Sequence, residues 1–175
     1  MVGPVGNLSD EEISTMHRTR NDLPHKARAG IEKLLNARLA DALDLAAQAK
    51  QAHWNVKGPN FIALHELFDT LHVALAGHVD TLAERITALG GTARGTVQTV
   101  ARTSTLKAYP EDITSGHAHG VALADRLADF AAKLRSAIDA ADRLGDAGTA
   151  DLFTGASRDI DKQLWFIEAH LQDTD

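Results

Sequence analysis

The feature that most constrains this chain is an apolar stripe that runs without a break through residues 61–89. Its members recur in steps of three and four residues, the spacing of one face of an α-helix: Phe61, Leu64, Phe68, Leu71, Leu75, Val79, Leu82, Ile86 and Leu89. Gly90-Gly91 then ends the helix. A second helical stripe covers residues 26–56 and stops at the turn sequence KGPN at 57–60. The sequence therefore predicts two long antiparallel helices.

The rest of the chain predicts two more long helices and no strand. Residues 92–116 are rich in threonine and turn residues, so they form a long connection with room for one short helix. A third long helix is expected at about 117–144 and a fourth at about 146–171, separated by a break between Gly145 and Gly148. Four helices of this length favour an all-α, ferritin-like four-helix bundle with a long crossover between its second and third helices. Residues 1–24 are expected to be a tail, and 25–175 the bundle domain.

Composition excludes several classes of protein. The chain has no cysteine, which excludes disulfides, zinc–thiolate sites, iron–sulfur clusters and thiol nucleophiles. No run of residues is long and apolar enough for a transmembrane helix, and the first residues lack the pattern of a signal peptide. We therefore expect a cytoplasmic protein that does not enter a membrane, with an association with the nucleoid left open. Its formal net charge is −6.

One face of the helix at 61–89 carries side chains that bind metals. At about 100° per residue, His65, Asp69, Asp80 and Glu84 share an arc of about 100° that lies away from the apolar stripe. His65 with Asp69, and Asp80 with Glu84, are spaced four residues apart, so each pair can hold one cation. Taken singly, such residues are usually solvated or packed; the shared face is what favours a metal site. Imidazole and carboxylate without sulfur suit iron, manganese or zinc.

The two pairs cannot meet within one chain. Fifteen residues separate His65 from Asp80, which is roughly 22 Å of helix, whereas metal–ligand bonds are about 2 Å long. Two copies of the helix that cross antiparallel near residue 74 or 75 would bring the first pair of one chain to the second pair of the other. His53, on the preceding helix, should lie level with His65 across the turn. The crossing point offers side chains small enough for close approach: Val73, Ala76 and Gly77.

Four runs of residues in the chain resemble a known family. The run KQAHWNVKGPNFIALHELFD at 50–69 looks like the signature of the Dps family, the mini-ferritins named as DNA-binding proteins from starved cells. The runs DTLAER at 80–85, SRDIDK at 157–162 and LWFIE at 164–168 fit the same family. The similarity begins near TRND at 19–22 and covers about 150 residues.

The resemblance implies a hollow dodecamer built from two-fold dimers, with an iron-oxidising centre at each dimer interface. It implies that Fe²⁺ is oxidised there, preferentially by hydrogen peroxide, and that Fe³⁺ is stored as mineral inside the shell. No haem is expected. Five residues match the family's ferroxidase ligands: His53, His65, Asp69, Asp80 and Glu84.

The resemblance also suggests roles for residues around the ligands. It makes Trp54 a neighbour of the centre that intercepts oxidising equivalents, whereas packing alone would make it a core residue. Three aspartates near the start of the last helix are candidates for acidic three-fold pores, against the alternative of helix capping: Asp142, Asp146 and Asp151.

Two other functions compete with this interpretation. A 24-subunit ferritin or bacterioferritin needs Glu-x-x-His motifs for its intrabundle diiron site, and this sequence has none. A DNA-compacting protein needs a basic arm that neutralises phosphates. Residues 1–30 carry four basic and four acidic side chains, so we expect weak or no DNA binding at neutral pH. His17 and His25 would add positive charge in mild acid.

Overall fold

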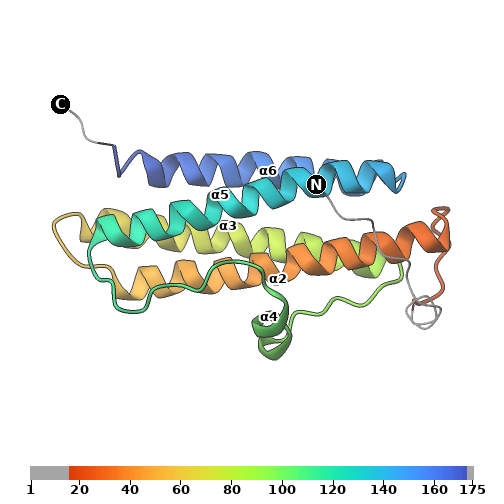
Figure 1. Ribbon diagram of the computed structural model, residues 1–175, viewed down its shortest axis with the longest axis horizontal. Coiled ribbons are helices and arrows are strands. Elements are labelled where there is room, and N and C mark those ends of the chain that lie inside the picture. Colours follow the sequence, from red (N-terminus) through yellow and green to blue (C-terminus); the bar gives the residue numbers. More distant parts are fainter. Residues whose placement is uncertain (1–15, 173–175) are drawn as a thin grey trace.

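The computed structural model describes residues 16–172 and contains, in that range, five α-helices and no named strand (Figure 1). Four of the helices are long and lie alongside one another, and the fifth is a short helix on the side of the bundle. Their bounds are α2 His25–Asn55, α3 Phe61–Ala88, α4 Val97–Thr103, α5 Gly116–Arg143 and α6 Ala147–Glu168. The all-α, ferritin-like fold and the short helix in the crossover are confirmed.

The core of the bundle is aliphatic. On α3 the buried residues repeat the apolar stripe seen in the sequence: Leu64, Phe68, Leu71, Leu75, Leu82 and Ile86. Only three aromatic rings, those of Phe68, Phe130 and Phe153, are among the fully buried side chains of the described residues. Burial of each such leucine or phenylalanine stabilises the fold by about 1.5–3 kcal/mol. Packing of these stripes places α2 against α3 and α5 against α6.

The turn between α2 and α3 sets the register of the two helices. Gly58 has a φ of 119°, a backbone conformation that side chains rarely adopt, so glycine is needed at this point of the turn. The backbone amide of Lys57 donates to the carbonyl of Thr114 at 2.8 Å, which ties the turn to the end of the crossover. Gly58 therefore allows the backbone conformation of the turn, and the hydrogen bond between Lys57 and Thr114 fixes its position on the bundle.

Two carboxylates of α2, from Asp41 and Asp44, hold the crossover between α3 and α5 against that helix. Asp41, fully buried, accepts a hydrogen bond from the backbone amide of Thr105 at 2.7 Å and pairs with Arg38 at 2.9 Å. One turn further on, Asp44 accepts a hydrogen bond from the hydroxyl of Ser104. These contacts fix the path of the segment that leads to Tyr109.

The segment before α2 lies against the end of α3. The backbone amide of His17 donates to the carbonyl of Gly90 at 2.7 Å. Gly90 has a φ of 87°, and a Cβ there would come within 2.5 Å of the His17 carbonyl oxygen. Glycine at position 90 thus allows both the end of α3 and the close passage of the preceding segment.

One pore candidate is wrong. Asp146 is buried, with 3% of its surface exposed, and it caps α6 by accepting a hydrogen bond from the backbone amide of Thr149 at 2.9 Å. It also accepts a hydrogen bond from Arg85 at 2.7 Å. Because its carboxylate oxygens already accept these hydrogen bonds, Asp146 stabilises the start of α6 and does not line a channel. Asp142 and Asp151 are exposed, and their role in a pore stays a prediction.

Within residues 16–172, no helix combines the length and the apolar character needed to cross a membrane.

Candidate metal centre

The hairpin of α2 and α3 brings the two predicted histidine ligands into contact. The rings of His53 and His65 stack with their centroids 3.7 Å apart and their planes 22° apart. The Nδ1 atom of His53 lies 2.8 Å from the carbonyl oxygen of His65, and the Nδ1 atom of His65 lies 2.9 Å from the carbonyl oxygen of His53. His53 and His65 thus lie opposite each other across the turn, as expected from the sequence.

This reciprocal pairing decides which nitrogen can bind a metal. A carbonyl oxygen can only accept a hydrogen bond, so Nδ1 of each ring carries the proton. In the neutral imidazole, Nε2 then keeps its lone pair, which is the form that ligates a metal. A backbone carbonyl that holds the second ring nitrogen of a metal-binding histidine is the usual support of such ligands. His53 and His65 are therefore oriented for coordination by their own backbone.

Asp69 lies one turn after His65 on α3 and is paired with a cation. The ammonium of Lys50, from α2, donates to the Asp69 carboxylate in a short contact. This hydrogen bond is the main reason that the pKa of Asp69 lies below its usual range, and it outweighs the opposing effect of desolvation. The carboxylate is thus ionised and half-exposed, with its charge balanced by Lys50.

The other two predicted ligands lie at the far end of α3 and are exposed. No hydrogen bond or ion pair from another described side chain holds the carboxylate of Asp80 or of Glu84. The neighbouring Arg85 turns inward, donating to Thr149 at 2.9 Å and to Asp146 at 2.7 Å, which pins this end of α3 to the start of α6. The backbone of this pair is therefore fixed, while its carboxylates face away from the bundle.

Within the described chain no three histidine or acidic side chains come close enough to hold a metal ion. The structure brings His53, His65 and Asp69 to one end of α3, and leaves Asp80 and Glu84 at the other end. The stretch between the two ends is open: Val73 is 65% exposed, and a Cβ at Gly77 would meet nothing within 4 Å. One chain therefore carries the two groups of predicted ligands at opposite ends of α3, with an exposed stretch of the helix between them.

Trp54 is not a core residue. Its side chain is 68% exposed, so the interpretation of this tryptophan as core packing is wrong. It lies next to His53 in the last turn of α2.

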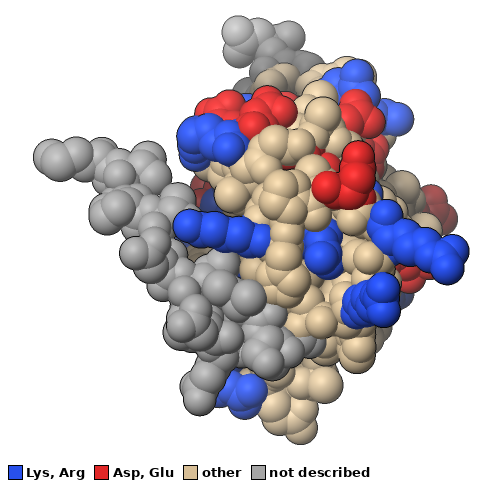
Figure 2. All heavy atoms as spheres, turned by 90° about the vertical axis from the view of Figure 1, so that its right-hand side faces the viewer, with Lys and Arg blue, Asp and Glu red and all other residues tan. Residues whose placement is uncertain are grey.

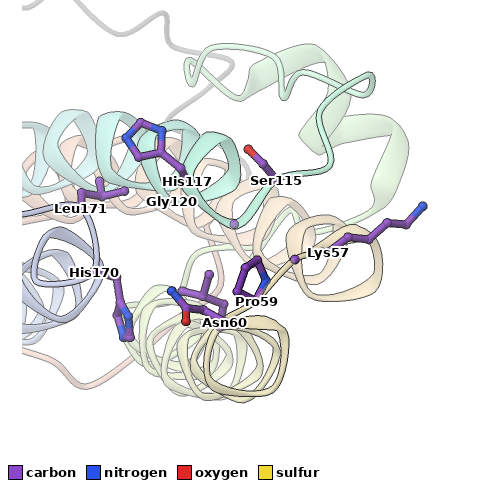
Figure 3. Close-up of a pocket in the computed structure, with 11 residues that line it drawn as sticks. Lys57, Pro59, Asn60, Ser115, His117, Gly120, His170 and Leu171 are labelled. Carbon is purple, nitrogen blue, oxygen red and sulfur yellow. The ribbon is translucent and has the colours of Figure 1, made fainter. Parts of the chain in front are cut away.

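A pocket of about 360 Å³ opens at the same end of the bundle, between the turn after α2 and the ends of α5 and α6 (Figure 3). Its polar lining includes Lys57, Asn60, His117 and His170. Figure 3 shows the ring of His170 beside Asn60, whereas the ring of His117 turns away from it. No aspartate or glutamate lines this pocket, so its composition does not suit a hard cation such as Mg²⁺ or Ca²⁺.

Two features of the site were missed in the sequence. The pairing of Lys50 with Asp69 depends on the register of α2 against α3, although Lys50 lies three residues before His53, on the same side of its helix. The bonds between each histidine and the other's carbonyl follow from the turn geometry, which residue spacing alone does not resolve.

Comparison with known proteins gives a consistent result. A family model described as a ferritin-like domain matches residues 32–175. The chain is 54% identical over 157 residues to a DNA protection during starvation protein of Agrobacterium fabrum, an alignment that covers 90% of this chain and 97% of that protein. Among solved structures it is similar to DpsC from Streptomyces coelicolor, with a TM-score of 0.88, 30% identity, and coverage of 92% and 94% of the two chains. It is similar to DpsA14 from the same organism, with a TM-score of 0.86, 33% identity, and coverage of 91% and 95%.

Proposed function

This chain belongs to the Dps family of ferritin-like proteins, and from that premise we propose that it oxidises Fe²⁺ at centres shared between two subunits. The oxidant that we propose is hydrogen peroxide, and the product is Fe³⁺ mineral held in a shell of twelve subunits. Removal of Fe²⁺ and peroxide together protects the cell from oxidative damage. A cytoplasmic location remains part of this proposal.

The observation that carries the proposal is the division of the ligands between the two ends of α3. His53, His65 and Asp69 are gathered at one end, and two exposed carboxylates stand roughly 22 Å of helix away. An isologous dimer about a two-fold axis near residue 74 or 75 would unite opposite halves and form two equivalent sites. The open space at Gly77 supports this arrangement, because glycine is not required there by the chain's own packing.

The ligand set suits the chemistry. Two Fe²⁺ ions each give up one electron, and one hydrogen peroxide accepts both, so that its O–O bond breaks and its oxygens leave as hydroxide or water. Imidazole holds the ferrous ion, while carboxylate oxygen accepts both Fe²⁺ and the harder Fe³⁺. A small number of protein ligands leaves positions for peroxide and allows the ferric product to move on.

Lys50 has a defined part in this scheme. Its ammonium balances the charge of Asp69 before iron arrives. An incoming Fe²⁺ ion would take over the carboxylate, because a divalent cation interacts with it more strongly than a monovalent one at similar distance. The lysine is then a placeholder that keeps Asp69 ionised and oriented towards the histidine pair.

A complementation experiment tests the shared site. One variant carries His53→Gly and His65→Gly, and a second carries Asp80→Asn and Glu84→Gln. Each alone should lose peroxide-dependent Fe²⁺ oxidation by about 100-fold or more, because the centre is incomplete. Co-expressed with two different affinity tags, the variants form mixed dimers in which one of two sites has every ligand. Random pairing should restore about one quarter of the wild-type rate.

The outcome separates a shared site from a site within one chain. Light scattering on every preparation serves as the control for assembly, and a particle of twelve subunits is expected. Mixed assemblies that stay as inactive as the two parents would contradict a shared site. Single variants with the wild-type rate would contradict the ligand assignment itself.

The alternative function, compaction of DNA, is proposed to be weak at neutral pH. In the view of Figure 2, basic and acidic side chains lie among one another on the upper part of this end of the bundle, and its middle carries mainly Lys and Arg. The net charge of −6 per chain repels a phosphate backbone. A gel shift titrated with salt is the test, and tight binding of the intact assembly at neutral pH and physiological salt would overturn this view.

A further inference from the structure

A second group of reactive side chains lies beneath the crossover. Tyr109, the one tyrosine in the chain, has its hydroxyl 2.7 Å from Nδ1 of His119, and the two ring planes are within 14° of parallel. His119 is 1% exposed and Tyr109 is half-buried. The proposed iron chemistry uses neither residue.

The proton in this hydrogen bond belongs to the tyrosine. The Nε2 atom of His119 is buried and has no hydrogen-bond partner among the described residues. A phenol is a stronger hydrogen-bond donor than a neutral imidazole N–H, which places the proton of the neutral ring on Nε2. Nδ1 is then the acceptor, and the hydroxyl of Tyr109 donates to it. The pair is a phenol hydrogen-bonded to a free base.

This pair lies close to the candidate metal centre. Asn55, whose carbonyl acts on His119, follows His53 by two residues in the last turn of α2. The ring of His119 also meets the ring of Phe68 edge-on, with centroids 6.4 Å apart, and Phe68 precedes Asp69 on α3. His119 therefore packs against the residue that directly precedes Asp69 on α3, and its partner Tyr109 lies near this end of the hairpin.

We propose that Tyr109 and His119 act together as an electron donor that quenches one-electron oxidants released at the metal centre, with Tyr109 giving the electron and His119 taking the proton. This proposal rests on the iron–peroxide function proposed above. It adds a protective step for the case in which only one Fe²⁺ ion meets a peroxide.

The step balances. A lone Fe²⁺ ion reduces hydrogen peroxide by one electron to give Fe³⁺, hydroxide and a hydroxyl radical. One electron from Tyr109 converts the hydroxyl radical to hydroxide, while the phenolic proton moves across the hydrogen bond to Nδ1 of His119. The products are a neutral tyrosyl radical and an imidazolium. The backbone groups of Asn55 and Ile113 favour the charged form of the His119 ring, which stabilises that imidazolium.

The surroundings favour this coupled step over simple loss of a proton. Burial raises the pKa of Tyr109 above its usual range, and burial also lowers the pKa of His119. The phenol therefore stays protonated and the imidazole stays neutral until an electron is removed. The guanidinium of Arg126 lies 5.6 Å from the centre of the tyrosine ring, which makes the ring harder to oxidise and restricts the reaction to strong oxidants.

A pocket gives the radical a route back to the resting state. Tyr109 lines a cavity of about 530 Å³ between α2, α4 and the crossover, together with Gln48 and Leu106. A small one-electron reductant in this cavity can return the electron, and the proton then moves back from His119. Ascorbate is a suitable probe of this size and chemistry.

Pulse radiolysis tests the pair without iron. Azide radicals oxidise exposed tryptophans first, and Trp54 and Trp165 are 68% and 60% exposed. In the wild-type protein the tryptophanyl absorption should decay as a tyrosyl absorption appears, and the conversion should slow in D₂O because a proton moves with the electron. Any tyrosyl signal belongs to Tyr109, since the chain has no other tyrosine. Ascorbate should shorten its lifetime.

Three variants divide the contributions. Tyr109→Phe keeps the ring and should abolish the tyrosyl signal, leaving long-lived tryptophanyl radicals. His119→Asn keeps an acceptor for the hydroxyl but no base, and should slow the conversion at least tenfold and remove its dependence on D₂O. Trp165→Phe is the matched control for loss of an aromatic ring, and should retain the conversion. Circular dichroism checks each fold; should His119→Asn not fold, Tyr109→Phe and the D₂O effect still decide.

The same signal is then sought with iron. Wild-type protein with less than one Fe²⁺ per site and excess peroxide, freeze-quenched for electron paramagnetic resonance, should show a tyrosyl radical that Tyr109→Phe lacks. Absence of tyrosyl formation in the radiolysis of the wild-type protein would overturn the proposal, as would an unchanged conversion rate in His119→Asn. Radiolysis that succeeds while iron is not oxidised would instead count against the proposed iron chemistry.

Discussion

The two ends of α3 carry the same kind of chemistry but are built in different ways. At the start of the helix, His65 is held by the backbone of α2 and stacks on His53, and Asp69 is held by Lys50. At the far end, Asp80 and Glu84 project from the bundle with no described side chain bonded to their carboxylates. At the start of α3, contacts within the chain fix the side chains of the predicted ligands. At the far end, they fix only the helix backbone.

The contacts within one chain therefore orient one group of predicted ligands and leave the other without side-chain partners. The fold of one chain orients the imidazoles before any metal or second chain arrives. It does nothing to orient the carboxylates, although Arg85 fixes the helix beneath them. In the proposed dimer, the carboxylates of Asp80 and Glu84 would be oriented by the contact that a partner subunit makes across Val73 and Gly77.

The largest effect is expected when the crossing point of the two α3 helices in the proposed dimer is blocked. Gly77→Leu should leave the bundle folded, because a side chain at this position meets nothing in its own chain. It should prevent close pairing across α3, and peroxide-dependent Fe²⁺ oxidation should fall by about 100-fold or more. Sedimentation and stopped-flow oxidation assays measure the two effects.

Gly155→Leu is the matched control, since Gly155 also has open space around it but lies on α6. Its assembly and oxidation rate should resemble those of the wild type. A Gly77→Leu protein that assembles and oxidises Fe²⁺ normally would contradict pairing at this face.

A smaller effect follows from loosening the backbone of the carboxylate end. Asp146→Ala removes the cap of α6 and the partner of Arg85, and should lower the free energy of unfolding by about 2 kcal/mol. Burial opposes ionisation of Asp146, but its bonds to Thr149 and Arg85 prevail and lower its pKa below the usual 3.8. Its stabilising effect is therefore complete above pH 3.8 and is lost as the pH falls through the lowered pKa.

Denaturant unfolding at several pH values measures this contribution. The difference between the wild type and Asp146→Ala should be constant near neutral pH and shrink in acid. Asp142→Ala, a change at an exposed neighbouring aspartate, should lie within about 0.5 kcal/mol of the wild type. A similar loss in both variants would show that capping is not the cause.

The smallest effect is expected from a substitution near the start of α3, where Lys50 pairs with Asp69. Lys50→Met keeps the length of the side chain and removes the cation that competes for Asp69. The affinity for Fe²⁺ should rise by about two- to fivefold, the range of an exposed ion pair. The pKa of Asp69 should move up towards its usual range, because the main cause of its lowering is gone. Calorimetry under anaerobic conditions and carboxyl NMR report these changes, and weaker iron binding would identify Lys50 as a support of the site rather than a placeholder.

Most of the fold was predictable because helix periodicity is a local property. The apolar stripe at 61–89 and the Gly90-Gly91 stop predict α3 to within one residue of its observed end at Ala88. The prediction for the last helix extends to 171, whereas α6 ends at Glu168, since helix ends depend on a final turn that no stripe defines. Asp146 looked exposed in the sequence because its burial arises from Arg85, which lies 61 residues away along the chain.

Less of the candidate site was predictable. Spacing alone put His65, Asp69, Asp80 and Glu84 on one face, favoured a metal site and required a second chain, but the choice of iron over manganese or zinc came from family resemblance. The contacts that need register between helices were not visible: Lys50 with Asp69, and Tyr109 with His119. Such pairs join residues from separate elements, and no periodic signal marks them. The ligand roles themselves stay predictions.

The wide separation of the two half-sites has a consequence for the order of events after synthesis. A newly made chain can fold, stack its two histidines and balance Asp69 with Lys50, yet on the proposed site it has nowhere to complete the reaction. Chemistry then begins only when two folded chains meet, so its onset depends on the square of the subunit concentration in dilute solution. Unpaired chains would be unable to oxidise iron outside a shell, so assembly would restrict the reaction to places where the ferric product can be stored.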